Sequence, residues 1–214
     1  MPTRTKSRPV FARYYARVSP AMETGGMAGH RRRALDGLTG TVIEIGAGNG
    51  LNFPHYPAGV TSVLAVEPDP YLREIAAQQA RRARVPVEVR DGVAERLPAA
   101  DAAFDAAVVT LVLCSVADQR AVLAELHRVV RPGGQLRFLE HVQAGTPGLR
   151  RVQRLVDATV WPLLLGGCHT GRDTAATIAS NGFTIERLDE FRFPPSRWST
   201  PATPHVSGVA VRDP

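Results

Sequence analysis

A glycine-rich segment that directly follows a β-rich run constrains the fold of this chain most. Residues 41–45 are rich in β-branched side chains and lead into the run Glu44-Ile45-Gly46-Ala47-Gly48-Asn49-Gly50. Glycine lets a ligand approach the backbone closely, because a Cβ atom would fill the same space. The spacing E-x-G-x-G-x-G differs from the G-x-G-x-x-G of dinucleotide folds, where a pyrophosphate sits on a helix N-terminus. The segment therefore predicts a tight, ligand-holding turn after a strand, with Glu44 orienting either the turn or an ammonium group of the ligand.

Predicted strands and helices alternate along the chain. Apolar periodicity predicts strands at 41–45, 61–66, 86–90, 104–110, 135–141, 183–192 and 205–211. It predicts helices at 10–18, 70–83, 118–130, 149–161 and 173–180, and a short helix that starts near Leu51. The 118–130 helix has an N-cap candidate in Asp118 and ends at the turn sequence Arg131-Pro132-Gly133-Gly134. This order indicates βαβ units and a mostly parallel sheet.

The length of 214 residues suits one sizeable core, so we expect a single domain over 1–214. Residues 1–38 form a basic N-terminal arm and helices, and 145–170 form a helical insertion on the substrate side. Residues 1–33 carry a net charge of +7, whereas the remainder carries −1. A nearly neutral body argues against nucleic acid as a partner, and we expect the arm either to cap the ligand site or to stay solvated.

Residue counts exclude several kinds of protein. Lys6 is the only lysine, which excludes a P-loop and a Schiff-base lysine. The two cysteines are too few for a disulfide scaffold and favour a cytoplasmic location. The longest nearly apolar run, 106–116, is well short of the ~20 residues of a membrane helix, so we expect no stable membrane insertion.

Three further segments accompany the glycine turn. Val66-Glu67-Pro68-Asp69 ends the second strand, where an acidic side chain accepts hydrogen bonds from both hydroxyls of a ribose. A run from Asp91 to Pro98 follows the third strand, where an adenine ring is expected, and the turn at 131–134 precedes the fifth. Together the four segments cover about 41 to 141 in a fixed order.

In this combination the chain resembles the class I S-adenosylmethionine-dependent methyltransferases, and the ubiquinone/menaquinone-methyltransferase-like group in particular. The resemblance implies S-adenosyl-L-methionine as cofactor and S-adenosyl-L-homocysteine as product. It also implies a Rossmann-like α/β fold with a seven-stranded, mostly parallel sheet of order 3-2-1-4-5-7-6, strand 7 antiparallel and helices on both faces. The implied cofactor-binding residues are Glu44, Gly46, Ala47, Gly48, Asn49, Gly50, Asn52, Glu67, Pro68, Gly92, Val93, Ala94, Glu95, Thr110, Leu111 and Val112. Many relatives have an aspartate for the adenine amino group where this chain has Val93, so Asp91, a backbone carbonyl or water is expected to replace it.

A narrower resemblance is to the methyltransferase-like thiol S-methyltransferases. It rests on Asn52-Phe53, Tyr56-Pro57, the run 110–116, Glu140-His141-Val142, Gly167-Cys168 and Pro204-His205-Val206. This resemblance implies methylation of a small, lipophilic thiol. Two alternatives stay open: N-, O- or C-methylation of a lipid, quinone or secondary metabolite, and a non-catalytic protein that binds S-adenosylmethionine.

Candidate acceptor-side residues lie near the predicted carboxyl ends of the strands and in the insertion. His141 ends the 135–141 strand and is the candidate general base, unless it only hydrogen-bonds the insertion. The other candidates for contact with a small-molecule acceptor are Cys114, Asp157, Trp161, His169, Arg172 and His205. Cys114 is either a nucleophile or a small buried side chain. The cysteines lack a Cys-x-x-Cys spacing, so no metal site is predicted. A monomer and a homodimer are both compatible with the sequence.

Overall fold

The computed structural model describes residues 9–159, 161–195 and 200–214. The charged residues of the tail 1–8, which belong to the expected basic arm, lie outside this range. None of the helices in the described part of the chain is long and apolar enough to cross a membrane.

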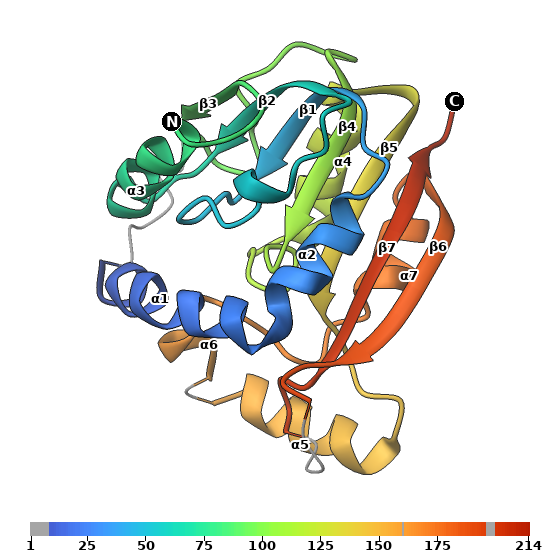
Figure 1. Ribbon diagram of the computed structural model, residues 1–214. Helices are drawn as coiled ribbons and strands as arrows, with labels where there is room; N and C mark the ends of the chain where they lie inside the picture. Colours follow the sequence, from blue (N-terminus) through green and yellow to red (C-terminus); the bar gives the residue numbers. More distant parts are fainter. Residues whose placement is uncertain (1–8, 160, 196–199) are drawn as a thin grey trace.

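One seven-stranded sheet organises the molecule, in the order β3-β2-β1-β4-β5-β7-β6 (Figure 1). The pairs among β1 to β5 are parallel, whereas β7 runs antiparallel to both β5 and β6. The predicted fold class and strand order are confirmed. The strands are β1 (Gly40–Ile45), β2 (Val60–Val66), β3 (Val87–Arg90), β4 (Phe104–Thr110), β5 (Val130–His141), β6 (Phe183–Arg192) and β7 (Pro204–Arg212).

Helices cover both faces of the sheet and bury two apolar cores. On one face, α4 (Gln119–Val129) and α7 (Thr174–Ala179) contribute Leu123, Leu126 and Ile178 to a core with Phe138. On the other face, α3 (Pro70–Ala80) and the end of α2 (Ala28–Leu35) pack on β1 and β2. Asp118 and Asp69 cap α4 and α3 through their side chains, as expected of an aspartate before a helix. The predicted cap at Asp118 is therefore confirmed.

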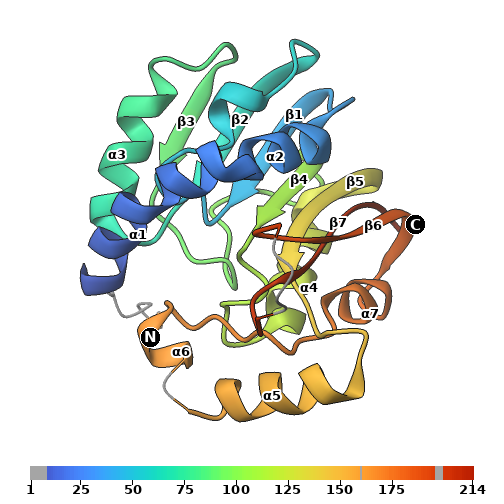
Figure 2. The ribbon, with the colours of Figure 1, turned by 60° about the horizontal axis from the view of Figure 1, so that its bottom comes forward.

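The carboxyl edge of the parallel strands faces three further helices. In Figures 1 and 2 the arrowheads of β1, β4 and β5 point toward α1 (Pro9–Met22), α6 (Trp161–Leu164) and α5 (Pro147–Asp157). A π-helical turn, η1 (Glu23–Met27), joins α1 to α2. The N-terminal helix and the insertion therefore meet at the edge where parallel sheets place their ligands.

Two helix predictions were wrong. The residues after Leu51 form only turns and a short 3-10 helix, η2 (Phe53–His55), because Pro54 limits helix growth and Asn52 is engaged in side-chain bonds to β1 and β4. The insertion, predicted as one helix over 149–161, consists of α5 and α6 with a break between them. The break follows Asp157, whose carboxylate turns away from the helix to bind the backbone of Thr170 and Gly171.

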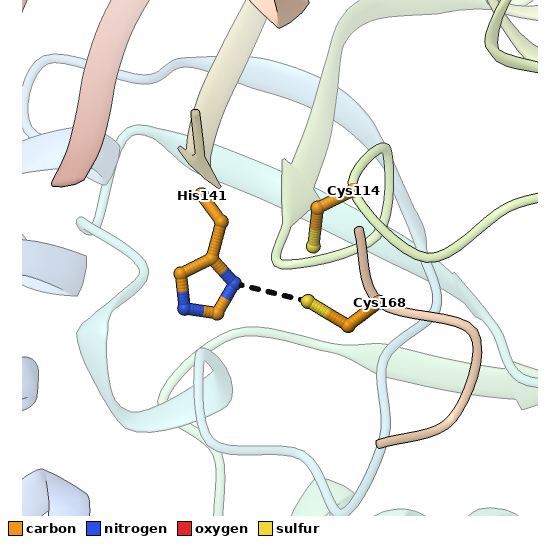
Figure 3. Close-up of side chains that lie close together, drawn as sticks. All are labelled: Cys114, His141 and Cys168. Carbon is orange, nitrogen blue, oxygen red and sulfur yellow. Dashed lines mark hydrogen bonds between the residues drawn. The ribbon is translucent and has the colours of Figure 1, made fainter. Parts of the chain in front are cut away.

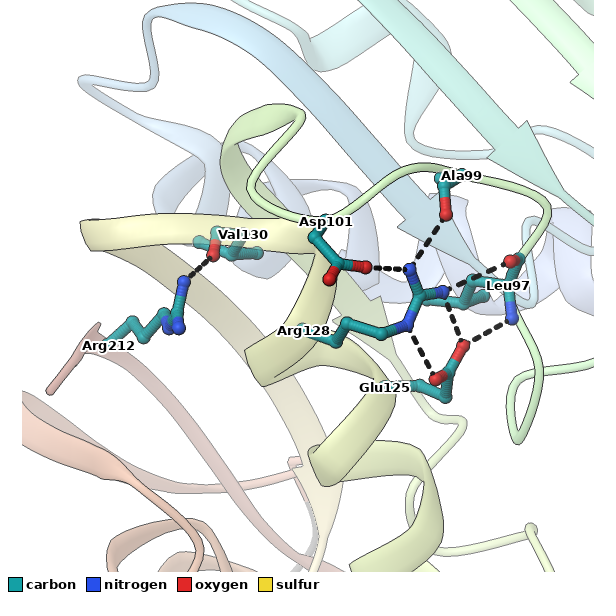
Figure 4. Close-up of polar contacts among 7 residues, drawn as sticks. All are labelled: Leu97, Ala99, Asp101, Glu125, Arg128, Val130 and Arg212. Atoms are coloured by element: carbon teal, nitrogen blue, oxygen red, sulfur yellow. Dashed lines mark hydrogen bonds and ion pairs between the residues drawn. The ribbon is translucent and has the colours of Figure 1, made fainter. Parts of the chain in front are cut away.

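Arg128 on α4 anchors the loop that leads from β3 to β4. Its guanidinium donates to the carbonyl oxygens of Leu97 and Ala99 and to the carboxylates of Asp101 and Glu125. Figure 4 shows these bonds converging on a single side chain. The loop that follows the predicted adenine segment is thereby fixed to the body of the protein.

Candidate functional site

A cavity of about 600 Å³ opens at the carboxyl ends of β1, β2 and β4. This volume falls in the range of small-molecule sites. Eleven of the sixteen residues predicted to bind a cofactor line it: Gly46, Gly48, Glu67, Pro68, Gly92, Val93, Ala94, Glu95, Thr110, Leu111 and Val112. The structure therefore brings three of the four sequence segments to one cavity, whereas the turn at 131–134 does not line it.

The glycine turn presents bare backbone to this cavity. Gly46 and Gly48 have φ angles of 61° and 57°, which favour glycine over residues with a side chain. A Cβ on Gly46 would lie 2.6 Å from Val112 Cγ2, and one on Gly48 would lie 3.3 Å from Tyr15. Side chains here would fill the space between the turn and the opposite walls, so the glycines keep the cavity open.

Glu67 joins the end of β2 to the glycine turn. Its carboxylate accepts hydrogen bonds from the N–H of Gly48 at 2.8 Å and of Asp69 at 2.9 Å. Burial raises the pKa of this carboxyl group, and the two backbone donors oppose the rise. Each oxygen has a second lone pair, so Glu67 can hold the turn and still accept from a ligand hydroxyl.

Glu44 lies behind the turn and does not line the cavity. Its two oxygens accept from Asn52 Nδ2 at 2.9 Å and from the hydroxyl of Tyr56 at 2.6 Å. Arg31 on α2 donates to Asn52 Oδ1 and to Glu23. Burial raises the pKa of Glu44 to about 7, against the lowering effect of Tyr56, Asn52 and Arg31. Glu44 therefore orients the turn from behind, through Asn52.

The remaining predicted cofactor residues also lie outside the cavity lining. Asn49 donates to Ser19 on α1, and the N–H of Gly50 donates to the carbonyl of Ala47. Asn52 connects Glu44 to Thr110 at the end of β4. These residues shape the turn and fasten it to its neighbours.

The segment after β3 faces the cavity through Val93 and Ala94. Asp91 points elsewhere: it is largely exposed and forms an ion pair with Arg73 at 2.9 Å. Of the three substitutes considered for the missing adenine aspartate, the Asp91 side chain is thus already engaged outside the cavity.

Helix α1 closes one side of the cavity with Phe11, Ala12 and Tyr15. From the insertion, Gly166 lies directly against Phe11, and a Cβ on Gly166 would come within 2.5 Å of that ring. Phe11 and Tyr15 of the N-terminal helix thus form part of the cavity lining.

Glu140 supports the opposite wall, which follows β4. Its fully buried carboxylate accepts hydrogen bonds from the backbone N–H groups of Val112, Leu113 and Cys114, at 2.9 to 3.0 Å. Leu111, just before these donors, has a φ of 58°, a conformation that costs about 1–3 kcal/mol for a residue other than glycine. Glu140 therefore holds a strained turn in place at the cavity wall.

Two candidate acceptor-side residues, Cys114 and His141, meet Cys168 beyond this wall. Cys114 follows β4, His141 ends β5, and Cys168 lies in the loop after α6 (Figure 3). The Cys168 sulfur lies 3.4 Å from His141 Nδ1. A hydrogen bond from Cys114 and then the His141 ring lower the pKa of the Cys168 thiol to about 5, although burial opposes this. The pKa of the Cys114 thiol is raised well above its ordinary value by the hydrogen bond to Cys168 and by burial.

The other predicted acceptor-side residues mainly hold the insertion loop. Arg172 donates to the carbonyl oxygens of Leu113 and Val116, and Asp157 accepts from the backbone N–H groups of Thr170 and Gly171. His169 Nδ1 is in hydrogen-bonding contact with the carbonyl of Gly167 and with Arg172. None of these three side chains lines the cavity.

Trp161 lies beside Cys168, and His205 lies beside His141. The indole of Trp161 contributes to the lowered pKa of Cys168. His205 on β7 packs against His141 with ring centroids 4.3 Å apart. Its Nδ1 lies 2.9 Å from the carbonyl oxygen of Thr203 and therefore carries the proton. Burial, followed by the charge of His141, lowers the pKa of His205 to about 3, so its ring is neutral.

Sequence reasoning assigned no role to several residues that build the site. Glu140 and Cys168 were noted only as parts of a family resemblance, and Gln153 and Arg31 were not considered. Gln153 is buried on α5, accepts from the N–H of Ala144 and donates to the carbonyls of Val142, Thr170 and Pro201. A buried carboxylate inside a predicted strand was the one signal that could have pointed to Glu140.

Comparison with known proteins places these features in a family. A family model described as a methyltransferase domain matches residues 43–138. The thiol S-methyltransferase TMT1B of Mus musculus is 40% identical over 183 residues, which cover 83% of this chain and 74% of the mouse protein. The human thiol S-methyltransferase TMT1A is 34% identical over 175 residues, which cover 80% of this chain and 70% of that protein.

Solved structures share the fold. Geranyl diphosphate methyltransferase, in complex with S-adenosylmethionine, superposes with a TM-score of 0.69 at 16% identity, over 93% of this chain and 90% of that one. At this identity the likeness concerns the fold alone. The sequence identity with the thiol S-methyltransferases shows the family to which the chain belongs.

Proposed function

Because the chain belongs to the thiol S-methyltransferase family of S-adenosylmethionine-dependent methyltransferases, we propose that it transfers a methyl group to the thiol of a small, lipophilic acceptor. S-adenosyl-L-methionine is the cofactor, and S-adenosyl-L-homocysteine is the product. The observation that carries the proposal is the 40% identity over 83% of this chain, which reaches far beyond the general methyltransferase domain at 43–138.

The cavity fits the cofactor in three respects. A Cβ on Gly46 or Gly48 would fill the space that the cofactor's amino-acid end needs. The Glu67 carboxylate keeps free lone pairs for the two ribose hydroxyls. Val93 and Ala94 offer an apolar wall and backbone groups to the adenine ring. We propose these residues as the cofactor contacts, with Phe11 and Tyr15 of α1 excluding water from the covered side.

Bound S-adenosylmethionine supplies an electrophilic methyl group on a sulfonium. The protein's contribution to such an in-line displacement is mainly positioning, which can be worth up to ~7–11 kcal/mol. Glu67 fixes the cofactor, and the wall held by Glu140 fixes the acceptor. The acceptor thiol must also lose its proton, since the thiolate is the nucleophile.

The acceptor side favours ionised sulfur. The Cys168 sulfur lies 3.4 Å from His141 Nδ1, and the lowered pKa of this thiol supports a thiolate-stabilising environment around His141 and Cys114. We propose that His141 promotes ionisation of the acceptor thiol. The apolar residues of the insertion, among them the exposed Leu163 and Leu164, support a lipophilic acceptor.

The same features support a proposal on domain organisation and location. All seven strands share one sheet, and both sides of the site are built on it, so we infer a single methyltransferase domain. The cysteines Cys114 and Cys168 are both free, which fits the cytoplasmic location expected from the sequence.

A matched acceptor series tests the proposal. Calorimetry first measures binding of S-adenosylmethionine and S-adenosylhomocysteine. Transfer of a labelled methyl group is then measured to phenylmethanethiol, benzylamine and benzyl alcohol, which share one carbon skeleton. We expect binding of both cofactor forms and turnover of the thiol alone. Turnover of the amine or alcohol with an inert thiol would contradict thiol methylation, and failure to bind either cofactor form would contradict the cofactor assignment.

A further inference from the structure

Three side chains that commonly bind soft metal ions converge outside the lining of the cofactor cavity. The ligand atoms of Cys114, His141 and Cys168 all lie within 4.8 Å of one another. Figure 3 shows the two sulfur atoms and the imidazole directed toward a common point between the ends of β4 and β5 and the loop after α6. Both cysteines are buried, and neither is in a disulfide.

The spacing of these atoms is close to that of a tetrahedral zinc site. With Zn–S near 2.3 Å and Zn–N near 2.0–2.1 Å, neighbouring ligand atoms in a tetrahedron lie roughly 3.6–3.8 Å apart. The Cys168 sulfur and His141 Nδ1 are already 3.4 Å apart, and the widest pair is within 4.8 Å. Side-chain shifts of about 1 Å or less would complete the geometry around an ion.

The surrounding backbone holds the ligands firmly. The N–H of Cys114 donates to Glu140 at 3.0 Å, and its carbonyl accepts from the N–H of His169 at 2.8 Å. His141 is paired in register with His205 on β7. The backbone bond between Cys114 and His169 therefore holds the segment that carries Cys114 against the segment that carries Cys168.

His205 provides an independent observation beside the cluster. Because its Nδ1–H donates to Thr203, its Nε2 carries a lone pair. That atom is buried and has no hydrogen-bond partner among the described residues. A histidine that binds a metal through one nitrogen generally donates its other N–H to an acceptor. The His205 ring packs on the His141 ring with centroids 4.3 Å apart, so a modest side-chain shift would let this unpaired nitrogen accept from a metal-bound His141.

We propose that Cys114, His141 and Cys168 bind one zinc ion, and that its fourth coordination position takes the thiolate of the methyl acceptor. Two thiolates, one imidazole and an open position form a donor set known from catalytic zinc sites. Both cysteine segments also contribute to the cavity wall, through Val112 and Ser115 on one side and Gly166 on the other. The assignment of the fourth position rests on the proposed thiol methylation, whereas the metal site itself does not.

The coordination would solve the ionisation problem of the acceptor. A free thiol with a pKa of about 8.5 is only a few per cent ionised at pH 7, and metal coordination deprotonates it, which raises the thiolate fraction about 30-fold. The acceptor S–H releases its proton to solvent. The acceptor sulfur then forms the new S–CH₃ bond, and the electrons of the broken CH₃–S⁺ bond return to the cofactor sulfur. The products are a thioether and S-adenosylhomocysteine, with no net oxidation or reduction.

Cobalt titration tests the metal site without any reference to activity. The full chain is reduced, freed of metal with a chelator and shown to contain two titratable thiols, and Co²⁺ is then added. We expect one Co²⁺ per chain, with sulfur-to-cobalt charge-transfer absorption and visible bands of tetrahedral cobalt, and displacement by Zn²⁺. Absence of charge-transfer absorption in the reduced protein would overturn the site.

Variants assign the ligands. Cys114→Ser and Cys168→Ser should each lose part of the charge-transfer absorption and bind Co²⁺ more than about 100-fold more weakly, since even outer-shell changes cost 10–100-fold. His141→Gln should also weaken binding, whereas His55→Gln, on η2, serves as the matched control and should bind as the wild type does. Calorimetry with S-adenosylhomocysteine verifies that each variant is folded. Unchanged cobalt binding in Cys168→Ser would contradict the assignment.

The fourth position is tested on the cobalt-loaded protein. Phenylmethanethiol should add charge-transfer intensity, and benzyl alcohol should leave the spectrum unchanged. A spectrum that does not respond to the thiol would overturn the acceptor's place in the site while leaving the metal site intact. Full methyl transfer by metal-free protein would overturn the role of zinc in the reaction, yet would leave thiol methylation standing.

Discussion

The cofactor side and the acceptor side of the site each contain a carboxylate that accepts hydrogen bonds from backbone N–H groups, but the two carboxylates differ in role. On the cofactor side, the carboxylate of Glu67 accepts two backbone N–H groups and lines the cavity. On the acceptor side, the carboxylate of Glu140 accepts three backbone N–H groups and is wholly buried behind the wall. Both groups fix a turn at the end of a strand. Only Glu67 lines the cavity. We therefore call Glu67 the binding carboxylate and Glu140 the supporting carboxylate.

The two sides also differ in how the chain assembles them. On the cofactor side, each contributing segment, from the turn at 46–50 to the segment at 92–95, directly follows a parallel strand and carries its own short motif. The sulfur and imidazole groups of the acceptor side come from three segments, and His141 and Cys168 are 27 residues apart. Local motifs therefore define the cofactor side, whereas the sheet topology defines the acceptor side.

The largest effect is expected from removing the binding carboxylate. Glu67→Ala deletes the carboxylate that we propose as the acceptor of two ribose hydroxyls, and bonds to a charged group contribute about 1.5–3 kcal/mol each. We expect the affinity for S-adenosylmethionine to fall by about 100-fold or more, as measured by calorimetry. Glu67→Gln keeps one carbonyl acceptor and should lose less. An unchanged affinity in Glu67→Ala would show that the ribose lies elsewhere.

Removing the charge of the supporting carboxylate should act on stability first. Glu140→Gln leaves one oxygen for three buried N–H donors, and an unsatisfied buried donor costs about 1–3 kcal/mol. We expect a loss of about 2–4 kcal/mol in the free energy of unfolding, measured by urea denaturation. Thiol turnover should fall more than cofactor affinity. If Glu140→Gln lost cofactor affinity as strongly as Glu67→Ala, the distinction between binding and supporting carboxylates would fail.

A third carboxylate, Glu44, adds a pH dependence on the cofactor side. Its pKa is raised from 4.5 to about 7 in the folded protein, so the native state retains a proton that the unfolded state releases. Its contribution to stability is therefore complete below about pH 4.5 and is lost as the pH rises through 7. Glu44→Gln cannot ionise. The stability of the wild type relative to this variant should fall by about 2 kcal/mol between pH 5 and pH 8 in urea denaturation. A constant difference over this range would contradict the raised pKa.

The smallest expected effect is the coupling between the two sides where they touch. Gly46→Ala places a Cβ about 2.6 Å from Val112 Cγ2 and should weaken cofactor binding. In Gly46→Ala/Val112→Ala the clashing methyl group is gone, and we expect a coupling energy of about 1 kcal/mol in a double-mutant cycle on calorimetric affinity. The unfavourable φ of Gly46 remains for alanine, so recovery should be partial. Strict additivity of the two changes would show that the turn and the wall do not constrain each other.

Sequence reasoning identified most residues of the cavity lining on the cofactor side because their positions depend on local motifs. The glycine turn, Glu67 and the segment at Val93 follow strands directly, and parallel strands bring such ends to one edge. Of the two roles expected for Glu44, the structure favours orientation of the turn: Glu44 faces Asn52 and Tyr56, a direction that the strand sequence does not reveal.

The acceptor side could be predicted only in part. His141, Cys114 and His205 were named singly, but their convergence depends on the antiparallel pairing of β5 with β7 and on the loop after α6. Asp157 and Arg172 resembled pocket residues by position, although their charges are used to bind backbone in the insertion. The break between α5 and α6 follows from the same long-range bond of Asp157. Such contacts carry no periodic or motif signal.

The central claim is that one side of the site binds the cofactor and the other activates the acceptor. The Cys168→Ser protein tests it most directly, when both cofactor binding and methyl transfer to phenylmethanethiol are measured. The account predicts a dissociation constant for S-adenosylmethionine within about threefold of the wild type, together with a loss of about 100-fold or more in kcat/KM for the thiol. Wild-type transfer by this variant, or a loss of cofactor affinity that matches the loss of transfer, would contradict it.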